Sequence, residues 1–111
     1  MTDCLFCKIV ARTIPATLLL ENEHVVAFRD IRPAAPSHAL VVPRVHVAGA
    51  RDASAETFGH VLAAAQKVAT DLGLDESGYR LVINEGPDAG QSVLHLHCHV
   101  LGGRALAWPP G

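Results

Sequence analysis

The sequence predicts an α+β fold with an antiparallel five-stranded sheet, one long helix and one short helix. Residues 55–72 are the one stretch in which apolar residues recur at helical spacing over several turns. Strand-like apolar segments lie in two groups, one before and one after this stretch. A repeated βαβ fold needs a helix between successive strands, so a single long helix between two groups of strands favours an antiparallel sheet.

The length and composition are those of a globular protein. We expect residues 1–111 to form a single domain, because 111 residues is a usual domain length. The formal net charge of -2 argues against a broad basic surface for nucleic acid and favours a small anion held in a pocket. The apolar runs are too short to span a membrane, and the first residues lack the pattern of an export signal. We therefore expect a cytoplasmic protein.

Four elements are expected before the long helix, separated by residues that favour turns or ends. They are a short helix over 4–11 with Asp3 as its N-cap, hairpin strands over 17–21 and 25–30, and a strand over 39–42 that Pro43 ends. The prolines of residues 32–37 disfavour both a helix and a central strand, so this segment is expected to be a loop.

The long helix is expected to bury one face and to use Gly73 as its C-cap. Its apolar face consists of Phe58, Val61, Leu62, Ala65, Ala69 and Leu72. Its polar residues are interpreted as solvated surface, namely Glu56, Gln66, Lys67 and Asp71. Two further strands are expected over 79–84 and 93–101, joined by the glycine-rich residues 85–92.

Histidines occupy alternate positions in the last expected strand. Because side chains in an extended segment alternate between faces, His95, His97 and His99 are expected to share one face. The other face is expected to carry the core residues Leu94, Leu96, Cys98 and Val100. A strand with an ordinary polar outer face is the alternative, but three of the 7 histidines at alternate positions favour a functional site.

The segment before this strand is suited to an anion. Residues 84–92 contain Gly86 and Gly90, and glycines let backbone N–H groups converge on an anion. The side chains of Asn84 and Ser92 add neutral hydrogen-bond donors for phosphate oxygens. Loops of this composition are most often plain turns, which is the alternative. A neutral imidazole is nucleophilic near neutral pH, so attack on phosphorus is the favoured chemistry.

Residues 90–101, with the sequence GQSVLHLHCHVL, resemble the His-x-His-x-His signature of the histidine triad superfamily. The resemblance extends through residues 28–31, 36–43 and 81–86 and the C-terminal residues 108–111. It therefore covers almost the whole chain and is strongest to the histidine triad nucleotide-binding (Hint) branch.

The resemblance implies a nucleotide site in which the middle histidine, His97, attacks the α-phosphorus. His99 and Ser92 are implied to contact the phosphate and to help the leaving amine acquire its proton, with His38 in the relay around the nucleophile. The other implied substrate-binding residues are Phe28 and Ile31 at the base, Asp30 at the ribose hydroxyls, Asn84 near the phosphate, and Gln91, Val93 and Trp108. For His38, a histidine that closes a proline-rich turn is the alternative.

The C-terminal sequence Trp108-Pro109-Pro110-Gly111 is similar to the ending of family members in which the tryptophan packs near the partner subunit's site. The resemblance therefore implies a homodimer. A frayed end is the alternative, although it leaves a large apolar side chain in water.

The cysteines indicate a metal site. Three cysteines cannot all pair, so a disulfide framework is not expected. Cys4 and Cys7 have the spacing that lets two thiolates bind one metal, with His46 and His95 as candidates to complete a tetrahedral site. The resemblance implies a structural Zn²⁺ at these positions. Two reduced thiols on a short helix are the alternative, and a redox motif is disfavoured because no βαβ unit surrounds the pair.

The histidines thereby receive different tasks. His97 and His99 are expected to face the phosphate, whereas His95 turns toward the cysteines and anchors the N-terminal segment to the catalytic strand. His24 and His60 have no partners in this interpretation and are taken as surface residues.

The function implied by the resemblance is hydrolysis of the P–N bond of purine nucleoside phosphoramidates, of the adenosine 5′-monophosphoramidate type, through a nucleotidyl-histidine. Substrates and products are then AMP- or GMP-type nucleotides, and the chemistry requires no cofactor. One alternative is a dinucleoside polyphosphate hydrolase, which the short chain and the C-terminal sequence disfavour. Another is a nucleotide-binding scaffold protein whose hydrolysis is incidental.

Overall fold

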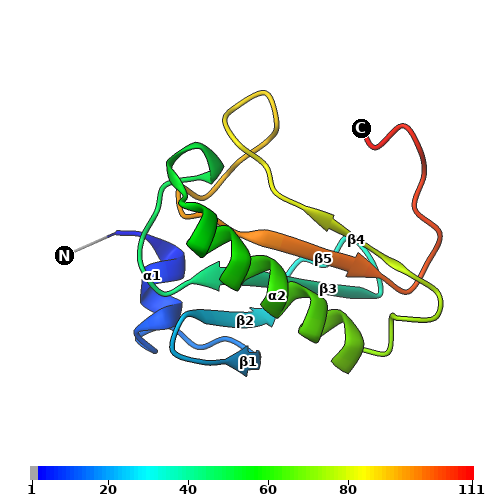
Figure 1. Ribbon diagram of the computed structural model, residues 1–111, viewed down its shortest axis with the longest axis horizontal. Helices are drawn as coiled ribbons and strands as arrows, with labels where there is room; N and C mark the ends of the chain where they lie inside the picture. The colour runs from blue at the N-terminus through cyan, green and yellow to red at the C-terminus, as the bar shows by residue number, and fades with distance from the viewer. Residues whose placement is uncertain (1–2) are drawn as a thin grey trace.

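The computed structural model describes residues 3–111. Met1 and Thr2, on which part of the expectation about an export signal depends, lie outside the described residues. Within these residues, five strands form one antiparallel sheet in the order β1-β2-β3-β5-β4, with a helix on either side (Figure 1). The elements are α1 (Leu5–Val10), β1 (Leu18–Glu21), β2 (Val25–Arg29), β3 (Ser37–Pro43), the 3₁₀ turn η1 (Ala50–Asp52), α2 (Ala55–Asp71), β4 (Tyr79–Val82) and β5 (Cys98–Gly102). The predicted α+β class is confirmed.

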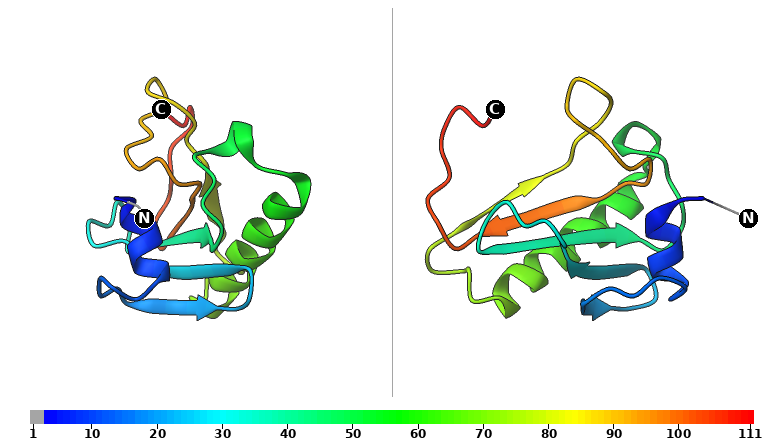
Figure 2. Two further views of the ribbon diagram at one scale, coloured as in Figure 1. Left: turned by 90° about the vertical axis from the view of Figure 1, so that its left-hand side faces the viewer. Right: turned by 180° about the vertical axis from the view of Figure 1, so that it is seen from behind.

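The two faces of the sheet carry separate cores, because alternate residues of each strand point to opposite sides. Helix α2 covers one face, against Val25, Ala27, Ala39, Val41, Cys98 and Val100. Helix α1 packs on the opposite face, where Phe6 and Ile9 meet Val26, Phe28, Leu40 and Val42. The left view of Figure 2 shows the two helices on opposite sides of the sheet. His38 on β3 and His99 on β5 alternate with residues of the α2-side core, so they lie on the α1 side.

Local hydrogen bonds explain where the hairpin and the long helix begin and end. In the β1–β2 turn the side-chain oxygen of Asn22 accepts from the backbone N–H groups of His24 and Val25. Ser54 caps α2, since its hydroxyl accepts from the N–H of Thr57 at 3.1 Å. The predicted end of α2 is one residue late: Leu72 is the C-cap, and Gly73 follows it with φ +76°.

The last strand is shorter than predicted. Strand β5 begins at Cys98, because residues 93–95 form a bend and the N–H of Leu96 donates to Val47 O at 2.7 Å outside the sheet. The alternation of faces nevertheless holds from His95 onward: Leu96 is buried in the same core as Cys98 and Val100, whereas His95 and His97 contact Phe6 on the α1 side. The prediction that Leu94 lies in the core is wrong, since it is 65% exposed.

Other predicted boundaries also differ from the structure, among them those of β4, β3 and α1. Strand β4 ends at Val82, two residues before the expected end. Strand β3 runs from Ser37 to Pro43, so it includes one loop residue and the proline that was expected to end it. The N-cap of α1 is Cys4, whose thiol accepts from the N–H of Cys7, and not Asp3.

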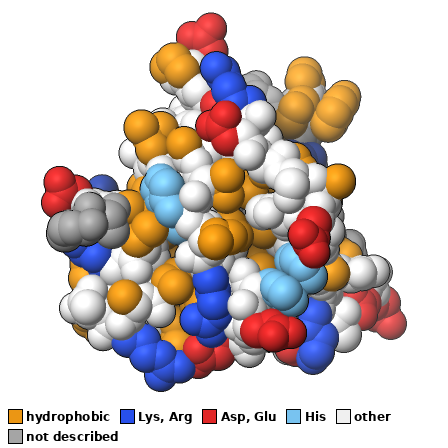
Figure 3. Space-filling model, turned by 60° about the vertical axis from the view of Figure 1, so that its left-hand side comes forward, with side chains coloured by type: hydrophobic (Ala, Val, Ile, Leu, Met, Phe, Trp, Pro, Cys, Tyr) orange, Lys and Arg blue, Asp and Glu red, His pale blue; other side chains and the backbone are white. Residues whose placement is uncertain are grey.

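The surface of the molecule carries charges of both signs. On the face drawn in Figure 3, acidic and basic side chains are interspersed with apolar ones, and histidines reach the surface in two separate places. Within residues 3–111, no helix has the length and apolar character needed to cross a membrane.

Candidate active site

A cavity of about 340 Å³ opens on the α1 side of the sheet. Its apolar lining consists of Leu5, Phe6, Ile9, Ile14, Pro15, Ala16, Phe28, Ile31, Leu40 and Val93. Its polar lining consists of Arg29, Asp30, Arg32, Ser92, His97 and His99. An apolar wall with a few convergent polar groups is the usual form of a small-molecule site.

His97 is held in one tautomer. Its Nδ1 lies 2.8 Å from the backbone carbonyl oxygen of His95, and a carbonyl oxygen can only accept, so Nδ1 carries the proton. In the neutral ring the second nitrogen, Nε2, is then unprotonated. The ring is 5% exposed and lines the cavity. His97 therefore presents a nucleophilic nitrogen from a fixed ring.

His38 and His99 form a second fixed arrangement. The N–H of Ala34 donates to Nδ1 of His38 at 2.9 Å, so the proton of neutral His38 is on Nε2. That nitrogen lies 2.9 Å from Nδ1 of His99 and 3.4 Å from the Oδ2 of Asp30. Nδ1 of His99 accepts from His38, which leaves the proton of His99 on Nε2. His99 is thereby oriented as a hydrogen-bond donor.

Burial keeps both of these histidines neutral. The pKa of His99 is lowered to about 4, chiefly by desolvation and also by the nearby His97 and His38, against an opposing effect of Asp30. Desolvation also lowers the pKa of His38, and again Asp30 opposes the shift. At neutral pH the pair therefore acts through the hydrogen bonds of neutral imidazoles.

The structure brings together most, but not all, of the predicted site residues. Seven of them line the cavity: Phe28, Asp30, Ile31, Ser92, Val93, His97 and His99. His38 lies behind His99 and does not line it. Asn84, Gln91 and Trp108 are not among the lining residues, and the side chain of Trp108 is 80% exposed.

The N–H groups of the two loop glycines have partners within the loop, so an anion bound there would be held by N–H groups of other residues. The N–H of Gly86 donates to the side chain of Gln91 at 2.9 Å, and the N–H of Gly90 donates to Pro87 O at 3.0 Å. Both glycine N–H groups are thus used inside the loop. The side chain of Gln91 also donates to Ala48 O and Val93 O. Gln91 therefore braces the loop that positions Ser92.

The sequence interpretation missed the contribution of α1 to the cavity. Leu5, Phe6 and Ile9 line it, and Phe6 packs edge-on against the ring of His97, with centroids 5.0 Å apart and an interplanar angle of 78°. Only the apolar character of a short N-terminal helix could have suggested this. Two basic residues at the cavity, Arg29 and Arg32, were also not predicted.

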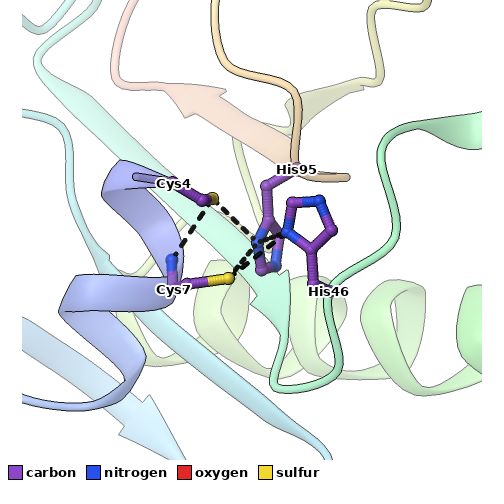
Figure 4. A group of neighbouring side chains, drawn as sticks. All are labelled: Cys4, Cys7, His46 and His95. Atoms are coloured by element: carbon purple, nitrogen blue, oxygen red, sulfur yellow. Dashed lines mark hydrogen bonds between the residues drawn. The ribbon is translucent and has the colours of Figure 1, made fainter. Parts of the chain in front are cut away.

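A second group of side chains lies at the N-terminal end of α1. It consists of Cys4, Cys7, His46 and His95 and is called the Cys/His cluster below. Figure 4 shows both imidazoles turned toward the two thiols. Nδ1 of His95 lies 3.3 Å from the Sγ of Cys4 and 3.4 Å from that of Cys7. Nδ1 of His46 lies 3.3 Å from the Sγ of Cys7 and 3.2 Å from Nδ1 of His95. All four donor atoms are within 4.8 Å of one another.

These distances fit a tetrahedral zinc ion. Zn–S and Zn–N bond lengths place neighbouring donor atoms of such a site about 3.3–3.8 Å apart. His95 is also in the required tautomer: its Nε2 lies 2.9 Å from Pro43 O, so Nε2 carries the proton and Nδ1 presents its lone pair. A set of two thiols and two imidazoles leaves no open position for water. The Cys/His cluster is therefore compatible with a structural Zn²⁺.

The interpretation of His24 and His60 as residues without partners is wrong. Their rings stack with centroids 3.6 Å apart and an interplanar angle of 12°. His24 belongs to the β1–β2 turn and His60 to α2, so the stack joins two elements that are distant in sequence.

Comparisons with known proteins agree with this geometry. A family model described as the HIT domain matches residues 11–106. A 14 kDa zinc-binding protein of Zea mays is 48% identical over 112 residues, which cover 96% of this chain and 87% of that protein. A HIT family hydrolase of Legionella pneumophila is 48% identical with a TM-score of 0.95, covering 98% of this chain and 100% of that chain. A histidine triad nucleotide-binding protein of Candida albicans is 32% identical with a TM-score of 0.86, covering 96% of this chain and 83% of that chain.

Proposed function

Because this chain belongs to the HIT family, whose solved members include hydrolases, we propose that it hydrolyses the P–N bond of purine nucleoside phosphoramidates. The observation that carries the proposal is the fixed tautomer of His97, whose Nδ1 proton is held by the carbonyl oxygen of His95. An unprotonated Nε2 on an immobilised ring is a nucleophile that needs no separate base.

In the proposed reaction Nε2 of His97 attacks the α-phosphorus, a P–N bond to the ring forms, and the P–N bond to the leaving amine breaks. The ring of the intermediate carries a positive charge, which the Nδ1–H bond to His95 O stabilises. Water then attacks the same phosphorus and releases the nucleotide and neutral His97. The amine takes up one proton as it leaves, and the attacking water gives one back.

Ser92 and the His38–His99 pair assist this transfer. The tautomers place a proton on Nε2 of His99, which can donate to a phosphate oxygen while the Ser92 hydroxyl contacts the leaving nitrogen. Ser92 and His99 both line the cavity together with His97. The Ser92 hydroxyl passes a proton to the leaving amine and regains one from the attacking water, while His99 keeps its Nε2 proton as a hydrogen-bond donor to the phosphate.

The rest of the cavity suits a nucleoside. Phe28 and Ile31 are apolar and line it, as a purine base requires. Asp30 lies between these two residues in sequence and its Oδ1 accepts from the N–H of Arg32 at 2.8 Å, which fixes the carboxylate for the ribose hydroxyls. Asn84 and Gln91 contribute through the loop that precedes Ser92.

The Cys/His cluster is proposed to hold Zn²⁺ in a structural role, outside the reaction. When bound, zinc ties the N-terminal helix to the segment that carries His95. Metal-binding thiols must stay reduced, which is the condition of the cytoplasm, so we place the protein there.

We also propose that the single domain acts as a homodimer. Trp108 is 80% exposed in the isolated chain, and burial of a tryptophan against a partner is favourable. Light scattering of the wild type and of Trp108→Ala checks this, with a dimer expected for the wild type. A monomeric wild type at working concentrations would contradict it.

The test is a comparison of kcat/KM for adenosine 5′-monophosphoramidate and for a diadenosine polyphosphate. The proposal predicts faster turnover of the phosphoramidate. Faster turnover of the polyphosphate would make the chain a dinucleoside polyphosphate hydrolase instead. A folded, AMP-binding His97→Ala variant that still restores a deletion phenotype would show that binding, and not hydrolysis, is the function.

A further inference from the structure

Helix α1 connects the Cys/His cluster to the cavity. Its first turn and N-cap carry the two thiols, Cys4 and Cys7, and its inner face carries Leu5, Phe6 and Ile9, which line the cavity. Two of the four residues of the Cys/His cluster and part of the cavity wall thus lie on one short helix and its N-cap.

Phe6 makes the closest link between the two sites. It is 4% exposed, and its ring packs edge-on against three others. The centroid distances are 5.0 Å to His97, 5.5 Å to Phe28 and 6.0 Å to His95. Edge-on aromatic pairs at these distances are attractive beyond the burial of their area. Phe6 therefore limits the tilt of the His97 ring, while His95 O fixes its Nδ1.

A helix of six residues cannot hold this position by itself, because short helices are unstable without tertiary contacts. Its N-terminus has no acidic residue in the first turn, and its cap is the thiol of Cys4. The same thiol lies 3.3 Å from His95, and that of Cys7 lies 3.3 Å from His46. The Cys/His cluster thus fixes the N-terminal end of α1 to two segments of the main fold.

We propose that Phe6 is a positioning residue for His97, and that the metal in the Cys/His cluster holds Phe6 in place. Metal content then sets both the nucleotide affinity of the cavity and the orientation of the nucleophile. The consequence for turnover rests on the proposed function, but the consequence for the His97 ring does not.

The first arm of the test is Phe6→Leu, with Phe58→Leu as the matched control on α2. Both proteins are prepared with the metal bound, and the zinc content of each is measured. Long-range ¹H–¹⁵N spectra of the imidazoles, without nucleotide, report the His97 ring. Phe6→Leu is expected to shift and broaden the His97 signals, to weaken AMP binding about threefold to tenfold, and to lower kcat, with normal zinc content. Phe58→Leu is expected to leave all of these unchanged.

The second arm removes the metal from the wild type with a chelator. The His97 signals are expected to move in the same direction as in Phe6→Leu, and AMP affinity is expected to fall by a similar factor. Far-UV circular dichroism checks that the metal-free chain stays folded. If it unfolds, the metal supports the whole fold and not Phe6 in particular, which overturns the dependence on the cluster and leaves Phe6→Leu to decide the positioning role.

Unchanged His97 signals and unchanged AMP affinity in Phe6→Leu would overturn the positioning role. A metal-free, folded wild type with the spectrum and AMP affinity of the loaded protein would overturn the dependence on the cluster. A wild type that binds no AMP would contradict the proposed function, and the His97 spectra would then decide this inference alone.

Discussion

The carbonyl oxygen of His95 accepts a hydrogen bond from Nδ1 of His97 at 2.8 Å, while the side chain of His95 belongs to the Cys/His cluster. One residue therefore serves two sites, its imidazole as a metal ligand and its carbonyl as the group that orients the nucleophile. The side chain can be changed without removing the carbonyl, so the two roles can be separated by mutation.

His95→Ala is expected to lose metal and stability first and to lose less turnover than His97→Ala, because the carbonyl oxygen that orients His97 is retained. The side chain is fully buried, and its removal leaves a cavity and an unpaired Pro43 O, at a cost of about 3 kcal/mol or more. His97→Ala, in the same segment, is the matched control and should keep about one zinc per chain while losing turnover. Metal analysis, urea denaturation and kcat of both variants check this. Normal zinc content in His95→Ala, or turnover lost ahead of stability, would remove His95 from the metal site.

The hydrogen bond from His38 to His99 is expected to matter for rate. In His38→Ala, Nδ1 of His99 loses its donor at 2.9 Å, and the ring is free to adopt the other tautomer. We expect kcat to fall roughly 10- to 100-fold, as for other groups that orient a functional histidine, with little change in KM. His38→Gln, whose amide can donate from a similar place, should recover part of the rate. Equal rates for the two variants would argue that His38 only fills space.

Stability is expected to fall with acid because of His99. Its pKa is lowered chiefly by burial to about 4 in the folded chain, whereas an unfolded histidine titrates near 6.5. Between these pH values the unfolded chain binds more protons than the folded chain, so the free energy of unfolding rises with pH. The stabilisation linked to His99 is fully present above about pH 6.5 and is lost as the pH falls toward 4. The slope is at most about 1.4 kcal/mol per pH unit for one proton.

Urea denaturation of the metal-loaded wild type and of His99→Gln at pH 5 and pH 7 measures this slope. The metal cluster is the same in both proteins, so the difference between them isolates His99. The wild type should lose more stability on acidification than the variant. Parallel losses would mean that His99 is not desolvated in the folded chain.

Two glycines provide opposite expectations for stability. Gly103 has φ +92°, and a Cβ there would lie 2.9 Å from the Cβ of Pro36. Gly103→Ala should lower the free energy of unfolding by about 1–3 kcal/mol. Gly59 lies in α2, exposed, with nothing within 4 Å of an added Cβ, so Gly59→Ala should raise it by about 1 kcal/mol. Urea denaturation checks both, and a neutral Gly103→Ala would contradict the backbone described for the β5 end.

The fold class could be predicted because local signals decide it. The apolar spacing of α2, its Ser54 cap and the Asn22 turn all act over a few residues. The start of β5 could not be predicted, because residues 93–95 form a bend and the N–H of the next residue, Leu96, donates to Val47 O, which is distant in sequence. A period-two pattern of histidines does not distinguish a strand from such a bend.

The sequence indicated His97 through its resemblance to a family signature and the Cys4–Cys7 pair through its spacing, and the structure places His97 at the cavity and the cysteines in the Cys/His cluster. The role of Phe6 was not predictable, since its contact with His97 joins residues that only the folded chain brings together. The partners of the two loop glycines were not predictable for a related reason, because their N–H groups bond to residues within the folded loop. Sequence shows which donors exist, but not which of them are already used.

The most direct test of the central claim is to trap the covalent intermediate. The protein is mixed with adenosine 5′-monophosphoramidate, quenched in alkali, which preserves a phosphorus–nitrogen bond to histidine, and digested for mass spectrometry. The account predicts an AMP adduct on His97. An adduct on any other histidine, or continued turnover by a folded His97→Ala variant, would contradict it.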